Sequence, residues 1–493
     1  MVRKLPSTTS RKNDHHGYST QDNTITAIVR SNSLPSGFTV SAENTISDST
    51  SPTPIYAWYD SASTTIYYYS SATTILMNKT STYLFYRMRA LSNLSTISTW
   101  DTAKVTDMSY MFGSAGYSAS SFTLDLSSWN TSSVTTMYSM FSSAGYSATT
   151  WSIGNLSSWS TSNVTNMSQM FSSAGHSATT FNISYVSSWD TSSVTNMSSM
   201  FRSAGSSATT WSIGDLSSWD TSSVTSMGSM FYYAGYSATT WSIGNLSSWD
   251  TSNVTNMSQM FSSAGYSATT FNISYVSSWD TSSVTNMSSM FYYAGANATT
   301  WSIGDLSSWD TSSVTTMQNM FLQTGFSASS FTLDLSSWNT SSVTNMSSMF
   351  SSVGHNATTW SIGDLSSWNT SSVTDMSSMF SSAGYKATTW SIGDFSDWDT
   401  SNVTNMKNMF FQAGYNASSF TLNLSSWNTS SVTNMSSMFS NAGYRATTWR
   451  VTIPKTNDGT TTGPIPNTTS NLYGSTTSVT ATPRTGKSFT LAN

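Results

Sequence analysis

Residues 192–201 read SSVTNMSSMF, and the same phrase returns at 282–291, 341–350 and 430–439. Looser copies of the form V-T-x-M-x-x-M-F fill the middle of the chain. In each copy a valine, two methionines and a phenylalanine occur at i, i+3, i+6 and i+7, which is typical of one face of a helical segment. We therefore expect these four side chains to point into a shared core, with one to two helical turns over Ser-Met-Phe-x-x-Ala.

A tryptophan closes every copy and sets the period of the chain. These tryptophans lie 29 or 30 residues apart, at positions 100, 129, 159, 189, 219, 249, 279, 309, 338, 368, 398 and 427. A fixed period in this range indicates stacked repeats, in which each unit buries its apolar face on its neighbours. The sequence thus predicts a repeat solenoid with short strands and one short helical turn in each 29/30-residue coil.

Each unit carries a second apolar cluster that alternates like a strand. In a 29-residue unit Phe122, Leu124 and Leu126 alternate with polar residues. In a 30-residue unit the corresponding stretch, WSIGNL at 241–246, has one residue more. One extra residue in a strand is a β-bulge. We expect such a bulge to explain the two unit lengths without a change of fold.

The ends of the chain depart from the repeat and predict four segments. Residues 1–53 lack periodicity and are expected to be a mobile N-terminal segment. Residues 54–100 contain the strand-like runs IYAWYD and TIYYYS and predict a strand-rich N-terminal cap, in which Phe85 stands for the phenylalanine of a degraded unit. Residues 101–452 predict a twelve-coil solenoid, and 453–493 a linker and small C-terminal cap.

The phrase DTSSVTNMSSMF, followed by a strand that ends in DLSSW, resembles the BspA-like leucine-rich repeats of bacterial surface proteins and the Met-Phe repeats of mycoplasma lipoproteins. The resemblance covers roughly residues 54–493. It implies a leucine-rich-repeat-like solenoid that is extracellular or on the cell surface and acts in adhesion. The unit differs from the usual one, because Ala-Gly-Tyr stands where a cysteine often follows Met-Phe. No apolar signal-peptide core is visible in MVRKLPSTTS at the start of the sequence.

Composition argues against several functional classes. Charged residues make up only 8% of the chain, and Arg202 is the only lysine or arginine between residues 105 and 385. A nucleic-acid partner would need clustered basic residues, so none is expected. No apolar run reaches the length of a membrane span. The absence of cysteine excludes a disulfide framework and thiolate metal sites.

Aspartates form two rows along the repeats, and both rows accept asparagine. One row opens the units, as at Asn130 and Asp190, and the other follows the strand, as at Asp125 and Asn155. Because the carboxylate is exchanged freely, an Asx-turn explains these positions best, with calcium binding and catalysis as weaker alternatives. We expect no catalytic residue, metal site or cofactor, and therefore no enzyme.

The positions that vary between units are the candidates for binding. The residue after Ala-Gly is Tyr in most units but His, Ser, Ala or Phe in others, which a buried position would not accept. Aromatic residues also follow Met-Phe in some units. We predict an outer aromatic edge for ligand binding, with these candidate residues: Tyr232, Tyr233, Tyr236, Tyr266, Tyr292 and Tyr293. The alternative is that the rings only cover the turn.

These observations predict a non-enzymatic, surface-displayed or secreted adhesin or ligand-binding scaffold. Its partner would be a protein or glycan of a host or neighbouring cell, with self-association also open. The alternatives are a self-associating fibre or coat protein and, less favoured, an ice-binding protein that uses its regular threonine rows.

Overall fold

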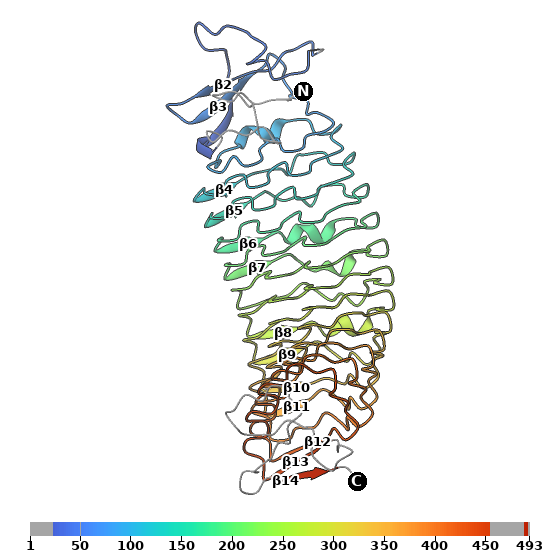
Figure 1. Ribbon diagram of the computed structural model, residues 1–493. Helices are drawn as coiled ribbons and strands as arrows, with labels where there is room; N and C mark the ends of the chain where they lie inside the picture. Colours follow the sequence, from blue (N-terminus) through green and yellow to red (C-terminus); the bar gives the residue numbers. More distant parts are fainter. Residues whose placement is uncertain (1–22, 50, 454–487, 492–493) are drawn as a thin grey trace. The chain divides into compact units, whose positions relative to one another are not determined.

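The computed structural model describes residues 23–49, 51–453 and 488–491 (Figure 1). Its chain divides into two compact units. The first unit comprises Met1–Val224 and Met230–Gly244, and the second comprises Thr225–Ser229 and Asn245–Asn493. In each unit, successive coils repeat the same path and stack on one another. The predicted repeat solenoid is confirmed.

The N-terminal cap is a three-stranded sheet in the order β1-β3-β2. It contains β1 (Ala27–Arg30), β2 (Tyr56–Asp60) and β3 (Thr65–Tyr69), and β1 runs parallel to β3 whereas β2 runs antiparallel to it. Ile28 is fully buried. The cap therefore begins before residue 54, and the boundary predicted at residue 53 is wrong. Residues 1–22 of the predicted mobile segment lie outside the described residues.

The coils carry short strands that pair in parallel with the next coil. In the first unit these are β4 (Ser121–Thr123), β5 (Thr150–Ser152), β6 (Thr180–Asn182) and β7 (Thr210–Ser212). In the second they are β8 (Thr270–Asn272), β9 (Thr300–Ser302), β10 (Ser330–Thr332), β11 (Thr359–Ser361), β12 (Ser419–Asn423), β13 (Thr448–Ile453) and β14 (Ser488–Leu491).

The parallel pairs are β4–β5, β6–β7, β8–β9 and β10–β11, and β12, β13 and β14 form a three-stranded sheet. Phe122 on β4 lies opposite Trp151 on β5, so the register equals one period. Strand β14 continues the parallel stack. The other residues of the predicted linker and small C-terminal cap, 454–487 and 492–493, lie outside the described residues.

The Met-Met-Phe stretch is a series of tight turns, not the predicted helical turn. The N–H groups of Met140 and Ala144 donate to the carbonyls three residues earlier, at 3.1 and 2.9 Å. Those of Ser139 and Phe141 donate instead to the next coil, at 3.0 and 2.9 Å. An α-helix needs its N–H groups for bonds within the segment. Every second N–H here is used between coils, and Ser139 has a positive φ of 53°. The observed series of tight turns and the predicted helical turn both place an inward side chain at every third residue, so the spacing alone does not distinguish them.

Short 3₁₀ helices occur elsewhere in the described chain, mostly between strand and tryptophan. They are η2 (Ser95–Thr99), η3 (Ser184–Ser188), η4 (Leu216–Ser218) and η5 (Ser274–Ser278). In coil 130–159 the extra residue is accommodated by Gly154, whose φ is +84°. A Cβ there would lie 2.6 Å from Asp125 Oδ1 of the shorter coil, so glycine fits this close approach of the two coils.

The core consists of ladders of identical side chains. Val164, Met167, Met170 and Phe171 are fully buried, as their spacing predicts. The ring centroids of Phe171 and Phe201 lie 5.8 Å apart with nearly parallel planes. Tryptophan also joins the coils through hydrogen bonds, since Trp189 Nε1 donates to the carbonyl of Leu156 at 3.1 Å. This arrangement buries the indole and satisfies its N–H, as a buried tryptophan requires.

Candidate functional site

The residue after Ala-Gly lies where the chain turns outward. Gly145 has a φ of +58°, and a Cβ added to it would lie 2.7 Å from the Cβ of Phe122 and 2.7 Å from the Cδ1 of Trp151. Only glycine therefore fits between these rings, and the next side chain, Tyr146, is placed outside the core, where it is half-buried. The same turn recurs along the chain, and within each unit it produces a row of side chains with one residue from each coil.

We call the ring-bearing members of this row, together with their neighbouring tyrosine pairs, the aromatic edge. Its described members are Tyr117, Tyr146, His176, Tyr232, Tyr233, Tyr236, Tyr266, Tyr292, Tyr293, Phe326, His355, Tyr385, Tyr415 and Tyr444.

The rings of the aromatic edge stack from coil to coil. In the first unit the centroids of Tyr146 and His176 lie 4.4 Å apart, at an interplanar angle of 15°. In the second unit the centroids of His355 and Tyr385 lie 4.6 Å apart, at 5°. Because each ring face covers the next, the row presents mainly ring edges and polar atoms to solvent. The edge is thus less open than its sequence variability predicts.

The six predicted tyrosines form two clusters, one in each unit. In the first unit the ring centroids of Tyr232 and Tyr233 lie 4.7 Å apart. The ring of Tyr233 stacks on that of Tyr236, at a centroid distance of 5.1 Å. The guanidinium carbon of Arg202 lies 5.0 Å from the centre of the Tyr232 ring, an attractive cation–π geometry. All four residues are on neighbouring coils of this unit, so they form one local patch.

In the second cluster, a tyrosine that follows Met-Phe reaches the edge residue of the preceding coil. The ring centroids of Tyr292 and Tyr293 lie 4.5 Å apart, and the ring of Tyr293 stacks on that of Tyr266 at a centroid distance of 6.1 Å. The coil of Tyr293 has the small Ala296 at the edge position, and Ala296 is buried. Tyr293 thus contacts the ring of the preceding coil, which the small side chain of Ala296 cannot do.

Two histidines are part of the stacked row. His176 stacks on Tyr146. His355 lies between the rings of Phe326 and Tyr385, and its ring centroid is 4.5 Å from that of Phe326. Desolvation by the neighbouring rings lowers the pKa of His176. Desolvation also lowers the pKa of His355. A hydrogen bond with Asn356 acts in the opposite direction and raises this pKa, whereas the positive charge of Lys386 lowers it further. Both imidazoles are therefore favoured in their neutral form, which suits a stack of uncharged rings.

The aspartate rows form Asx-turns, as predicted. Asp190 Oδ1 accepts the N–H of Ser192 at 3.0 Å, and Asn130 Oδ1 accepts that of Ser132 at the same distance. Since both side chains offer the same oxygen, the exchange of Asp and Asn leaves the turn intact. Within the described residues no group of three or more His, Asp or Glu side chains could hold a metal ion.

A third row of such turns lies in the stretch Asn-Met-Ser, which recurs in several coils. Asn166 Oδ1 accepts both the N–H and the hydroxyl of Ser168, at 3.0 and 2.6 Å. The motif Asn-Met-Ser therefore has a structural role next to the first buried methionine. Sequence reasoning did not identify this row, although the recurrence of Asn or Asp before Met was its visible signal.

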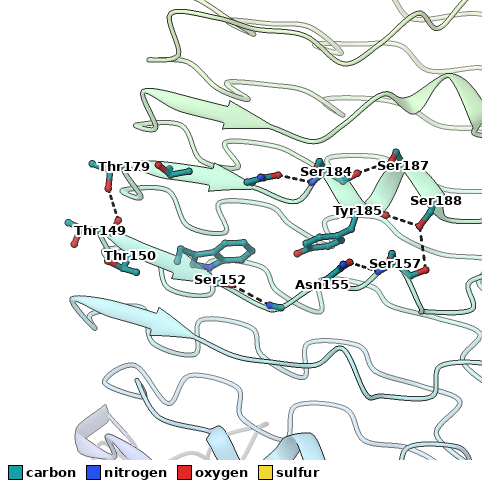
Figure 2. Close-up of a pocket in the computed structure, with 14 residues that line it drawn as sticks. Thr149, Thr150, Ser152, Asn155, Ser157, Thr179, Ser184, Tyr185, Ser187 and Ser188 are labelled. Atoms are coloured by element: carbon teal, nitrogen blue, oxygen red, sulfur yellow. Dashed lines mark hydrogen bonds between the residues drawn. The ribbon is translucent and has the colours of Figure 1, made fainter.

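A shallow hollow of about 820 Å³ lies in the first unit between coils 130–159 and 160–189 (Figure 2). It opens where the ladder of strands is interrupted, because β5 and β6 belong to different sheets. Trp151, Ser152 and Asn155 line one side, and Asn182 and Tyr185 line the other. None of the described residues that line it is charged. Nothing in the sequence pattern predicted this hollow.

A model of the family described as "Mycoplasma protein of unknown function, DUF285" matches residues 78–149, 145–264, 206–301, 233–361, 294–388 and 351–449. These matches together cover the repeats and the end of the cap. No curated protein and no solved structure matches the chain. The described part of the chain has no helix that is long and apolar enough to span a membrane.

Proposed function

The chain belongs to the DUF285 family of mycoplasma proteins, and on that premise we propose that it is a non-enzymatic, surface-displayed or secreted ligand-binding solenoid. We place it beside the BspA-like leucine-rich-repeat surface proteins that its repeat phrase resembles. Its partner is a protein or glycan on a host or neighbouring cell, and the aromatic edge is the contact surface. Under this proposal the coils act as a scaffold and carry no catalytic residue.

One observation carries this proposal: the side chains of the aromatic edge vary between coils that are otherwise nearly identical. Residues 151–201 and 241–291 differ at only two positions, and one of them is the edge position, His176 against Tyr266. Both residues are half-buried, whereas the adjacent core residues Phe171 and Phe261 are fully buried. A row that changes chemistry over a constant core suits recognition of a ligand.

The stacked geometry favours binding through ring edges and hydroxyl groups. The ring faces within the row contact one another, which leaves less face available for a sugar to stack on. Tyrosine has two side-chain torsions, so little conformational entropy is lost when it is immobilised, and its hydroxyl offers a hydrogen bond. The tyrosine clusters at Tyr232–Tyr233–Tyr236 and Tyr292–Tyr293 supply the largest contact area.

Replacing all six candidate tyrosines by serine is expected to weaken adhesion at least tenfold, equivalent to about 1.4 kcal/mol, because it removes the anchoring rings. Other coils already carry serine after Met-Phe, as at Ser142 and Ser172, and Ser206 occupies the edge position, so the fold is expected to persist. Binding would be measured on a glycan and extracellular-matrix array and on cells.

The matched control replaces the exposed threonines Thr255, Thr285 and Thr315 by serine, which leaves the aromatic edge unchanged. Binding of this control is expected to equal that of the parent. If the six-tyrosine variant folds and still adheres as well as the parent, the rings only cover the turn and the proposal is wrong. Concentration-dependent particle growth in light scattering, without array binding, would favour the fibre or coat alternative.

A further inference from the structure

We propose that the hollow between β5 and β6 binds a single neutral sugar residue. This site is separate from the aromatic edge and does not depend on the function proposed for that edge. Its volume, about 820 Å³, falls in the range of small-molecule sites. One buried hydroxyl, two amides and the break in the strand ladder support this site.

The Tyr185 hydroxyl is the first observation. It is buried and has no hydrogen-bond partner among the described residues. Figure 2 shows the ring of Tyr185 extending from its coil towards the chain that carries Ser152 and Asn155. A buried hydroxyl without a partner is unfavourable, and such groups in native proteins call for an explanation. A ligand hydroxyl in the hollow would supply the missing hydrogen bond.

Two asparagine amides are the second observation. Asn155 Oδ1 accepts the N–H of Ser157 at 3.0 Å, and Asn182 Oδ1 accepts that of Ser184 at 3.0 Å. These turns fix both side chains and use only the oxygen of each amide. The amide N–H groups are left to donate elsewhere, and both side chains line the hollow. They therefore offer fixed donors to an acceptor such as a sugar hydroxyl.

The strand break and the lack of charge select the ligand class. No ladder joins β5 to β6, because each is paired with the strand on its other side. Charged ligands would lose hydration without a charged partner here, since the described lining is entirely neutral. A neutral ring with several hydroxyl groups matches this mixture of donors and acceptors.

A cysteine in the hollow provides a local test, because the natural chain has none. Ser152 lines the hollow and is exposed, so the variant Ser152→Cys should react with iodoacetamide. Saturating glucose, galactose or N-acetylglucosamine is expected to slow this reaction at least threefold with at least one of the three. The charged sugars glucosamine and glucuronate are expected to protect less. The control Thr285→Cys, at an exposed position of the second unit, should not be protected.

Two further substitutions in the Ser152→Cys background test the named groups. Tyr185→Phe removes only a hydroxyl that has no partner, so folding should be unaffected, and it should raise the half-protecting sugar concentration about three- to tenfold. Asn182→Asp keeps the oxygen that accepts from Ser184 but removes the N–H donors, and it should have a similar effect. The proposal would be overturned if no neutral sugar protected Ser152→Cys, or if charged sugars protected it equally well. It would also be overturned if Thr285→Cys were protected to the same extent, or if Tyr185→Phe left the half-protecting sugar concentration unchanged.

Discussion

Replacing Phe261 by alanine is expected to lower the free energy of unfolding by about 3–5 kcal/mol. Phe261 is fully buried, and its ring lies parallel to that of Phe291 at a centroid distance of 5.9 Å and against Trp279 at 6.1 Å. The substitution removes the ring from a stack whose members lie in fixed positions on adjacent coils. The cavity cannot close easily, because the intercoil hydrogen bonds on both sides hold the backbone.

The matched control lies in the same coil. Asp250→Asn should have little effect, since Asp250 Oδ1 accepts hydrogen bonds from the N–H and hydroxyl of Ser252, at 3.0 and 2.6 Å, which an amide oxygen can also accept, and Asn130 already fills the corresponding place. Long repeat arrays depart from two-state unfolding, so the two variants are compared by their denaturant midpoints. A larger loss for Asp250→Asn than for Phe261→Ala would mean that the inside and outside of the coil are inverted.

Replacing Gly295 by alanine is expected to destabilise the chain by about 2–5 kcal/mol, from a left-handed backbone and from overpacking. Gly295 has a φ of +52°, and an added Cβ would lie only 2.4 Å from the Cβ of Phe271. That atom is attached to the backbone of a strand and cannot rotate away. The same turn places the edge residues, so this variant should also disturb the aromatic edge nearby.

Gly228→Ala serves as the control for this prediction. Gly228 does not have a positive φ, and an added Cβ would meet only the side chain of Asn256, at 3.1 Å. Serine stands at the same position in other coils, for example at Ser198 and Ser288. Thermal and denaturant unfolding should therefore be close to those of the parent. Equal losses for the two glycine variants would show that the close approach to Phe271 has been misplaced.

The sequence was sufficient to predict the repeating core. Valine, methionine and phenylalanine recur at a fixed spacing, and burial of Val164 and Phe171 follows from that spacing alone. The helical turn was wrong because a chain of three-residue turns places side chains on one face as a helix does. The deciding difference, that Ser139 bonds to the next coil, depends on a neighbour which local spacing cannot show.

The candidate sites were predictable to different degrees. The position of the aromatic edge followed from the variation after Ala-Gly, but the stacking of Tyr146 on His176 required the distance between coils. The hollow was not predictable, since it results from how strand pairs divide along the stack. Tyr185 looked like any other tyrosine in the sequence, and the burial of its hydroxyl became visible only in the folded coil.

The most direct test of the central claim, that neighbouring coils lie side by side in a register of one period, uses paired cysteines in the cysteine-free chain. Thr255 and Thr285 are exposed and one period apart, and the Thr285 N–H donates to the Thr255 carbonyl at 2.9 Å. Adjacent strands lie about 4.8 Å apart, within the range that a disulfide can bridge, whereas Thr255 and Thr315 would be separated by roughly 10 Å. Mass spectrometry after mild oxidation should find a disulfide in Thr255→Cys/Thr285→Cys and free thiols in Thr255→Cys/Thr315→Cys. A disulfide in the second variant and free thiols in the first would contradict the stacking on which both proposed sites depend.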